Sequence, residues 1–174
     1  TGANGEKITI PNDGDFTTLP DIEYYAVLDD TRDTRTITVS SAGTSVNPAG
    51  GVNDAVTLNL GSLAYTGTIT GNVVVPDILS LGNGADISGG TITNVEALTL
   101  ASGASVTMTA AQNQGFTGAV TAAGTETITI SGDGAVTTLS NIETYVLGDD
   151  STNARAVIIG AAALNLVANN ASDT

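Results

Sequence analysis

The chain of 174 residues has no cysteine, no histidine and no tryptophan, and it has only four basic residues. Without cysteine it can form neither a disulfide nor a thiolate metal site. Without histidine it lacks the commonest acid–base group and zinc ligand. Few enzyme mechanisms remain available to such a chain, so the sequence predicts a protein that is not an enzyme and that has no certain cofactor.

Positive charge is scarce as well. The 18 acidic side chains face Lys7, Arg32, Arg35 and Arg155, which leaves a net charge of −14. A surface of that sign repels nucleic acid and anionic lipid headgroups. The longest apolar run, from Ala156 to Ala168, is short and is interrupted by Gly160 and Asn165, so we expect no transmembrane segment.

Aromatic residues make up only 3% of the chain, although 41% of it is apolar. The core must therefore consist of thin layers of alanine, valine, isoleucine and leucine. Threonine and the other β-branched residues favour strands, and 21 glycines supply tight corners. The composition predicts an all-β fold.

A long internal repeat is present. Residues 1–54 align without gaps on residues 121–174, at an offset of 120, and 18 of the 54 positions are identical. In this alignment TLPDIEYYAVLDD, from Thr18 to Asp30, matches TLSNIETYVLGDD, from Thr138 to Asp150. The chain holds one 120-residue unit and the beginning of the next.

A third copy of the motif, TITNVEALTLASG, runs from Thr91 to Gly103, so the copies begin at positions 18, 91 and 138. These spacings are close to three and two steps of about 24 residues, a period that indicates a solenoid or another repeat architecture. We predict a parallel β-solenoid (β-helix) with roughly seven coils of about 24 residues, in which residues 1–174 form a single continuous segment.

The motif also predicts a corner. In NVEALTL the apolar positions Val95, Leu98 and Leu100 are spaced by three and then two residues, whereas a flat strand keeps a period of two. We place a bend at the glutamate, with Glu23, Glu96 and Glu143 directed to solvent. At Thr109 to Gln112, TAAQ has the form of a capping box and predicts one helical turn. Tandem β-sandwich domains are the alternative fold, since a 120-residue unit suits one sandwich.

Two acidic loops at equivalent positions are candidate calcium sites. They offer carboxylate and amide oxygens, which calcium prefers. The alternative is that these loops are solvated corners neutralised by Arg35 and Arg155. The candidate ligands are Asp29, Asp30, Asp33, Asp149, Asp150 and Asn153.

Weaker candidates are spread along the chain. Asp13, Asp15, Asp54 and Asp133 are acidic, but none completes a known calcium motif, and the glycine-rich stretch from Leu81 to Gly90 predicts a turn. The Thr-x-Thr pairs would form an ice-binding face only if they stacked in rank, and their irregular spacing argues against that. These pairs are Thr36/Thr38, Thr66/Thr68/Thr70, Thr91/Thr93, Thr107/Thr109 and Thr127/Thr129.

At SNIETYVLGDD and TNVEALTLASGASVTMTAAQ the sequence resembles the repeat regions of large secreted bacterial surface proteins. These are the haemagglutinin-like and repeats-in-toxin-associated adhesins and some surface-layer proteins. The resemblance implies export to the bacterial cell surface, an acidic and elongated body, and a role as stalk, filament or coat. It also raises calcium as a possible cofactor.

We therefore expect a structural, non-catalytic segment of an extracellular protein, either a self-assembling filament or an adhesin stalk, with further copies of itself as partners. The alternatives are a calcium-dependent surface-layer lattice subunit and a module that binds carbohydrate or a host surface. Glycan binding would require an exposed aromatic or polar patch, and among the four tyrosines Tyr25 and Tyr145 are expected to face inward.

Overall fold

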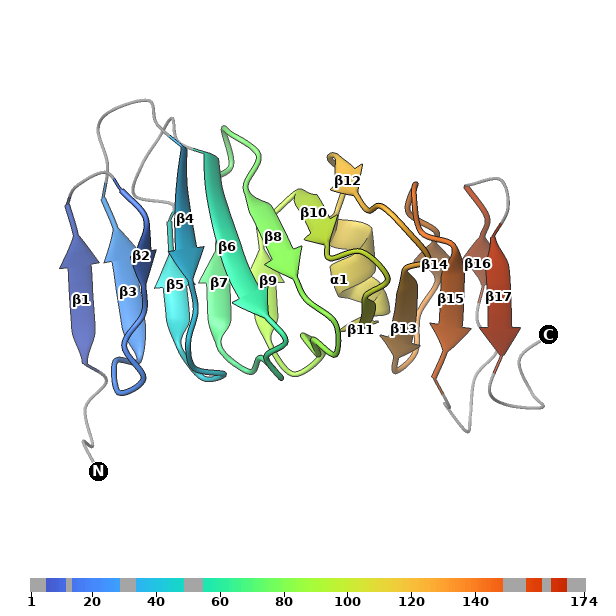
Figure 1. The fold of residues 1–174 in the computed structure, drawn as a ribbon, viewed down its shortest axis with the longest axis horizontal. Coiled ribbons are helices and arrows are strands. Elements are labelled where there is room, and N and C mark those ends of the chain that lie inside the picture. Colours follow the sequence, from blue (N-terminus) through green and yellow to red (C-terminus); the bar gives the residue numbers. More distant parts are fainter. Residues whose placement is uncertain are drawn as a thin grey trace.

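The structure is a computed structural model, and it describes residues 6–11, 14–28, 34–48, 55–148, 156–160 and 164–168. These residues form a parallel β-solenoid of about seven turns, which confirms the predicted fold class. Every strand pair is parallel. The first and last strands lie at opposite ends of an elongated stack (Figure 1).

Three faces run along the stack, and each coil passes through face 1, face 2 and face 3 in that order. Face 1 is a sheet of β1 (Lys7–Ile10), β3 (Tyr24–Val27), β5 (Ser45–Asn47), β7 (Thr68–Thr70) and β9 (Thr91–Thr93). Face 2 is a sheet of β2 (Phe16–Thr17), β4 (Thr34–Thr38), β6 (Ala55–Gly61), β8 (Ile78–Leu81), β10 (Ala97–Leu100) and β12 (Val120–Thr121).

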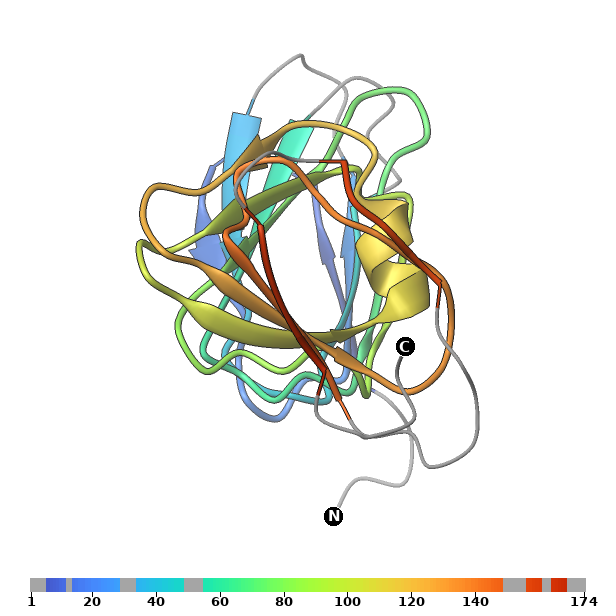
Figure 2. The same cartoon turned by 90° about the vertical axis from the view of Figure 1, so that its right-hand side faces the viewer.

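Face 3 is a sheet of β11 (Ser105–Thr109), β13 (Thr127–Ser131), β15 (Thr144–Leu147) and β17 (Asn165–Ala168). Isolated parallel bridges from Ala64 to Asp86 and from Asp86 to Thr107 extend it to earlier coils. Helix α1 (Ala110–Gly115) lies between β9 and the pair formed by β14 (Val136–Thr137) and β16 (Val157–Ile158), where face 1 would otherwise continue. Figure 2, which looks along the stack, shows the helix at the side of the coils.

The predicted helical turn is confirmed with its cap. Thr109 is the N-cap residue of α1, and its hydroxyl accepts a hydrogen bond from the backbone N–H of Gln112 at 3.1 Å. The side chain of Gln112 accepts in return from the backbone N–H of Thr109 at 2.8 Å. This reciprocal pair is a capping box. No helix in the described ranges has the length and hydropathy to span a membrane.

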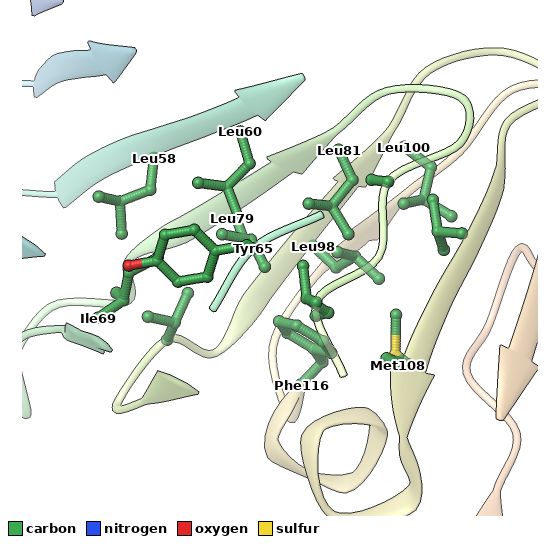
Figure 3. Packing of buried hydrophobic residues seen from close by; sticks show 14 of the residues in the cluster. Leu58, Leu60, Tyr65, Ile69, Leu79, Leu81, Leu98, Leu100, Met108 and Phe116 are labelled. Carbon is green, nitrogen blue, oxygen red and sulfur yellow. The ribbon is translucent and has the colours of Figure 1, made fainter. Parts of the chain in front are cut away.

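The core consists of stacked columns of aliphatic side chains, as the composition predicts. On face 2, Ile37, Leu58, Leu79 and Leu98 are consecutive register partners and all are buried. Figure 3 shows the leucines of this column beside Tyr65 and Phe116. Because each coil adds only a few inward side chains, every coil depends on its two neighbours for burial.

The coils are on average shorter than the predicted length of about 24 residues. Register partners lie 17 residues apart at Lys7 and Tyr24, 21 apart at Tyr24 and Ser45, and 23 apart at Thr68 and Thr91. The turns are roughly 21 residues apart on average. Corners of different length accommodate this variation without breaking the sheets.

This difference has a specific cause, because the three motif copies lie on three different faces. The strand after Glu23 is β3 on face 1, the strand after Glu96 is β10 on face 2, and the strand after Glu143 is β15 on face 3. Following the sheets, the motif advances by three and one-third turns and then by two and one-third turns. The 120-residue repeat thus spans five and two-thirds turns, and 120 divided by 5⅔ gives about 21 residues a turn.

Candidate functional site

The predicted calcium ligands Asp29, Asp30, Asp33, Asp149, Asp150 and Asn153 lie outside the described residues, as do Asp13, Asp54 and Arg155. Asp15 and Asp133 are described and exposed. Within the described ranges, no group of three or more acidic, histidine or cysteine side chains is placed to hold a metal ion. Arg35 is buried in β4, where it is 2% exposed.

The motif glutamates perform the same task in all three copies. The carboxylate of Glu23 accepts a hydrogen bond from the backbone N–H of Glu6 at 2.8 Å. Glu96 accepts from the N–H of Asp77 at 3.3 Å, and Glu143 accepts from the N–H of Glu126 at 3.0 Å. In each case the donor immediately precedes the strand that pairs with the strand following the glutamate. The motif glutamate therefore joins two neighbouring coils at a corner.

The expectation that these glutamates point only to solvent is thus incomplete. Glu23 is exposed, while Glu96 and Glu143 are half-buried. A solvent-facing carboxylate that also satisfies a backbone donor of the preceding coil holds the corner in register. The bend predicted at this residue coincides with that hydrogen bond.

Two buried acids at these corners were not predicted from the sequence. Asp77 is fully buried, and its carboxylate accepts from the backbone N–H of Val56 at 2.8 Å and of Asn72 at 2.6 Å. Glu126 is also fully buried and accepts from Gly103 at 3.0 Å and Ala123 at 3.2 Å. In the sequence, an acid directly before a short strand, as in DILSL and ETITI, is the available signal.

The ionisation of Glu126 is set by these contacts. Burial alone raises the pKa of its carboxyl, but the hydrogen bonds that it accepts from backbone N–H groups, that of Gly103 first, outweigh burial. The net effect holds the pKa of Glu126 below its usual value. The corner therefore contains a buried carboxylate that the fold stabilises in its charged form.

Some of the Thr-x-Thr pairs stack on one another locally, although their irregular spacing in the sequence does not predict it. Thr68 and Thr70 are register partners of Thr91 and Thr93, one coil on. Thr107 pairs likewise with Thr129, but the next partner along that column is Val146. In the preceding coil of face 1, Ser45 and Asn47 take the corresponding places. Among the described strands, the regular Thr-x-Thr ranks that an ice-binding face requires are thus limited to two coils.

The tyrosines serve the core. Tyr25 and Tyr145 are buried, as predicted, and Tyr65 is buried as well. The hydroxyl of Tyr65 donates to the carbonyl of Thr44 at 2.7 Å, and burial raises the pKa of this tyrosine. Tyr24 remains half-buried, with the Lys7 ammonium 5.2 Å from the centre of its ring.

A shallow groove lies beside α1. It has a volume of about 430 Å³ and is lined by Asn113, Gln114, Phe116, Thr117, Thr137 and Leu139. Asn113 is buried, and its side-chain amide donates to the carbonyl of Thr137, another lining residue, at 2.8 Å. None of these six lining residues is charged.

Comparison with known proteins identifies no relative. No family model matches the chain, and no curated protein or solved structure matches it either.

Proposed function

We propose that this chain is a structural, non-catalytic repeat segment that acts as an elongated stalk or spacer in a bacterial extracellular surface protein. The observation that carries the proposal is that the 120-residue sequence repeat is also a repeat of hydrogen bonds. The N–H of Leu19 donates to the Tyr25 hydroxyl at 2.7 Å, and the N–H of Leu139 donates to the Tyr145 hydroxyl at 2.9 Å. Both partners are shifted by 120 residues.

Further contacts repeat at the same offset. The hydrogen bond from the Glu6 N–H to the Glu23 carboxylate recurs between the Glu126 N–H and the Glu143 carboxylate. The register of β1 on β3 recurs in β13 on β15. A unit that reproduces its own inter-coil contacts after 120 residues can be joined end to end without a break in the core. Joining such units end to end makes the rod longer.

The dimensions follow from strand spacing. Parallel strands lie about 4.8 Å apart, so 5⅔ coils extend the rod by about 27 Å per 120-residue unit. The acidic charge of −14 makes neighbouring rods repel each other, which keeps them soluble and separate. The assignment to a bacterial surface rests on the resemblance of the repeated NIE and NVE motifs to surface-protein repeats.

Self-assembly belongs to the same proposal. The C-terminal coil leaves Ile158, Ile159 and Leu166 exposed, whereas Val46, which occupies the position of Leu166 in the first copy, is 1% exposed. In the first copy β7 covers that position. The continuation of a repeat array, or the first coil of a second copy, would provide an equivalent strand for this edge.

Electron microscopy of the purified chain at neutral pH, with calcium and with a chelator, tests the proposal. A stalk segment gives narrow rods under both conditions, and end-to-end assembly gives filaments of the same width. Sheets that form only with calcium would favour a surface-layer lattice and would implicate the loops containing Asp29 and Asp149. Compact particles without an elongated axis would contradict the proposal. In a separate experiment, specific binding on a glycan array would favour a carbohydrate-binding module.

A further inference from the structure

Helix α1 packs against β14, and the surface that it contacts, which includes Thr137, Leu139 and Tyr145, is called its seat below. The side-chain amide of Asn113 donates to the carbonyl of Thr137 at 2.8 Å, and its oxygen accepts from the Tyr145 hydroxyl at 3.0 Å. The same hydroxyl accepts from the N–H of Leu139 at 2.9 Å. Asn113 and Tyr145 are fully buried. The Asn113 side chain thus makes one hydrogen bond as a donor and one as an acceptor, and both bonds connect the helical turn to the next coil.

The same seat exists 120 residues earlier, on the edge strand β2 of face 2. Thr17 stands for Thr137, Leu19 for Leu139 and Tyr25 for Tyr145. The Leu19 N–H donates to the Tyr25 hydroxyl as its counterpart does. In the described part of the chain, however, no acceptor receives the Tyr25 hydroxyl proton, although this side chain is only 2% exposed. Burying a hydroxyl without an acceptor is costly.

Apolar side chains of this earlier seat are correspondingly less covered. Leu19 is 57% exposed, whereas Leu139 is half-buried beside the helix. Phe16 is half-buried and its ring centre lies 5.8 Å from that of Tyr25, whereas Val136 at the equivalent position is fully buried. Val136 belongs to β14, the strand that α1 contacts in the second copy, and Leu139 follows it.

The backbone of the earlier seat has the same shape. Gly134 has a φ of +132°, and Gly14 at the equivalent position has a φ of +119°. A Cβ atom added to Gly134 would lie 2.9 Å from the Cβ of Ala110, so the helix packs directly on this glycine. No atom of the described residues lies within 4 Å of a Cβ atom added to Gly14. Room for a small residue of a docked helical turn is therefore present.

We propose that the edge of β2 is a docking surface for a second helical turn of the α1 type, supplied by a 120-residue unit that precedes this one in the same polypeptide. The turn would have an alanine where α1 has Ala110 and an asparagine where it has Asn113. That asparagine donates to the carbonyl of Thr17 and accepts from the Tyr25 hydroxyl. This inference rests on the proposed repeat array and names the contact through which consecutive units join.

The test adds residues 91–120 of the chain to its own N-terminus, joined so that residue 120 precedes residue 1, the register that the repeat dictates. Amide hydrogen exchange followed by NMR reports on two places. The added copy of β11 should pair with β1 and slow exchange in Lys7 to Ile10. The added helical turn should slow exchange of the Leu19 N–H by about tenfold, because its acceptor becomes part of a closed network.

The matched control carries Asn113→Leu in the added copy alone. Strand β1 should remain protected, while the Leu19 N–H should return to the exchange rate of the chain without the extension. If the unaltered extension protects β1 and leaves Leu19 unchanged, the docking proposal is wrong and the array survives. If it protects neither, the added unit does not stack, and both proposals are contradicted.

Discussion

Glu143 bonds the backbone N–H of Glu126 at 3.0 Å, and Glu126 in turn bonds the N–H of Gly103 at 3.0 Å, so two acids link three successive coils at one corner of face 3. Asp77 and Glu96 form a similar pair on face 2. Carboxylates that accept from backbone donors across coils hold the register of a stack that has no disulfide and few ion-pair partners.

Replacing Glu143 by alanine should destabilise the fold by about 1 kcal/mol, because a charge-assisted hydrogen bond to the preceding coil is lost and the Glu126 N–H is left without that acceptor. Urea unfolding followed by circular dichroism measures the change. Asp21→Ala is the matched control, since this acid lies in an equivalent corner and is exposed. Equal stability of the two variants would contradict the assigned role.

The lowered pKa of Glu126 gives stability a defined pH dependence. The folded state binds a proton on this group less readily than the unfolded chain, whose pKa is near 4.5. The contribution is therefore present above about pH 4.5 and is lost as pH falls through the lower folded value. Glu126→Gln lacks this contribution.

The free energies of unfolding of the wild type and of Glu126→Gln, measured by urea titration between pH 6 and pH 3, give the comparison. Glutamine keeps an acceptor for the Gly103 N–H but cannot titrate. The difference between the two proteins should change in this window, with the wild type losing more stability on acidification. Parallel pH profiles would show that Glu126 is not the group responsible.

Gly71 is confined by its neighbours. A Cβ atom there would lie 1.9 Å from the backbone oxygen of Asn94 and 2.6 Å from the Asp77 carboxylate. Gly71→Ala should therefore cost about 3 kcal/mol through overpacking. Gly43→Ala is the control, because nothing lies within 4 Å of its added Cβ. A thermal unfolding midpoint for Gly71→Ala that matches the control would contradict this packing.

The two repeated tyrosines offer a matched comparison. Tyr145→Phe removes a hydroxyl that serves both Leu139 and Asn113, so a loss of about 2 kcal/mol is expected. Tyr25→Phe removes only the contact with Leu19 and should cost about 1 kcal/mol. Chemical denaturation of both variants measures the difference. A larger loss for Tyr25→Phe would reverse the assignment of the polar network to the second copy.

The sequence predicts the solenoid because aliphatic columns and the 120-residue offset are visible in it, and TAAQ carries its own capping signal at Thr109. It does not reveal the turn length. Copies of a motif on different faces differ by a fraction of a turn, and only strand pairing shows which face each copy occupies. Asp77 and Glu126 were missed because burial of an acid depends on backbone donors that stacking alone brings near.

Rod length tests the central claim most directly. Small-angle scattering can compare this chain with one that carries an additional 120-residue unit, residues 1–120, placed before residue 1. We predict that the maximum dimension grows by about 27 Å while the cross-section stays constant, because 5⅔ further coils stack on the same axis. A thicker particle of unchanged length, or two separately tumbling bodies, would contradict the account.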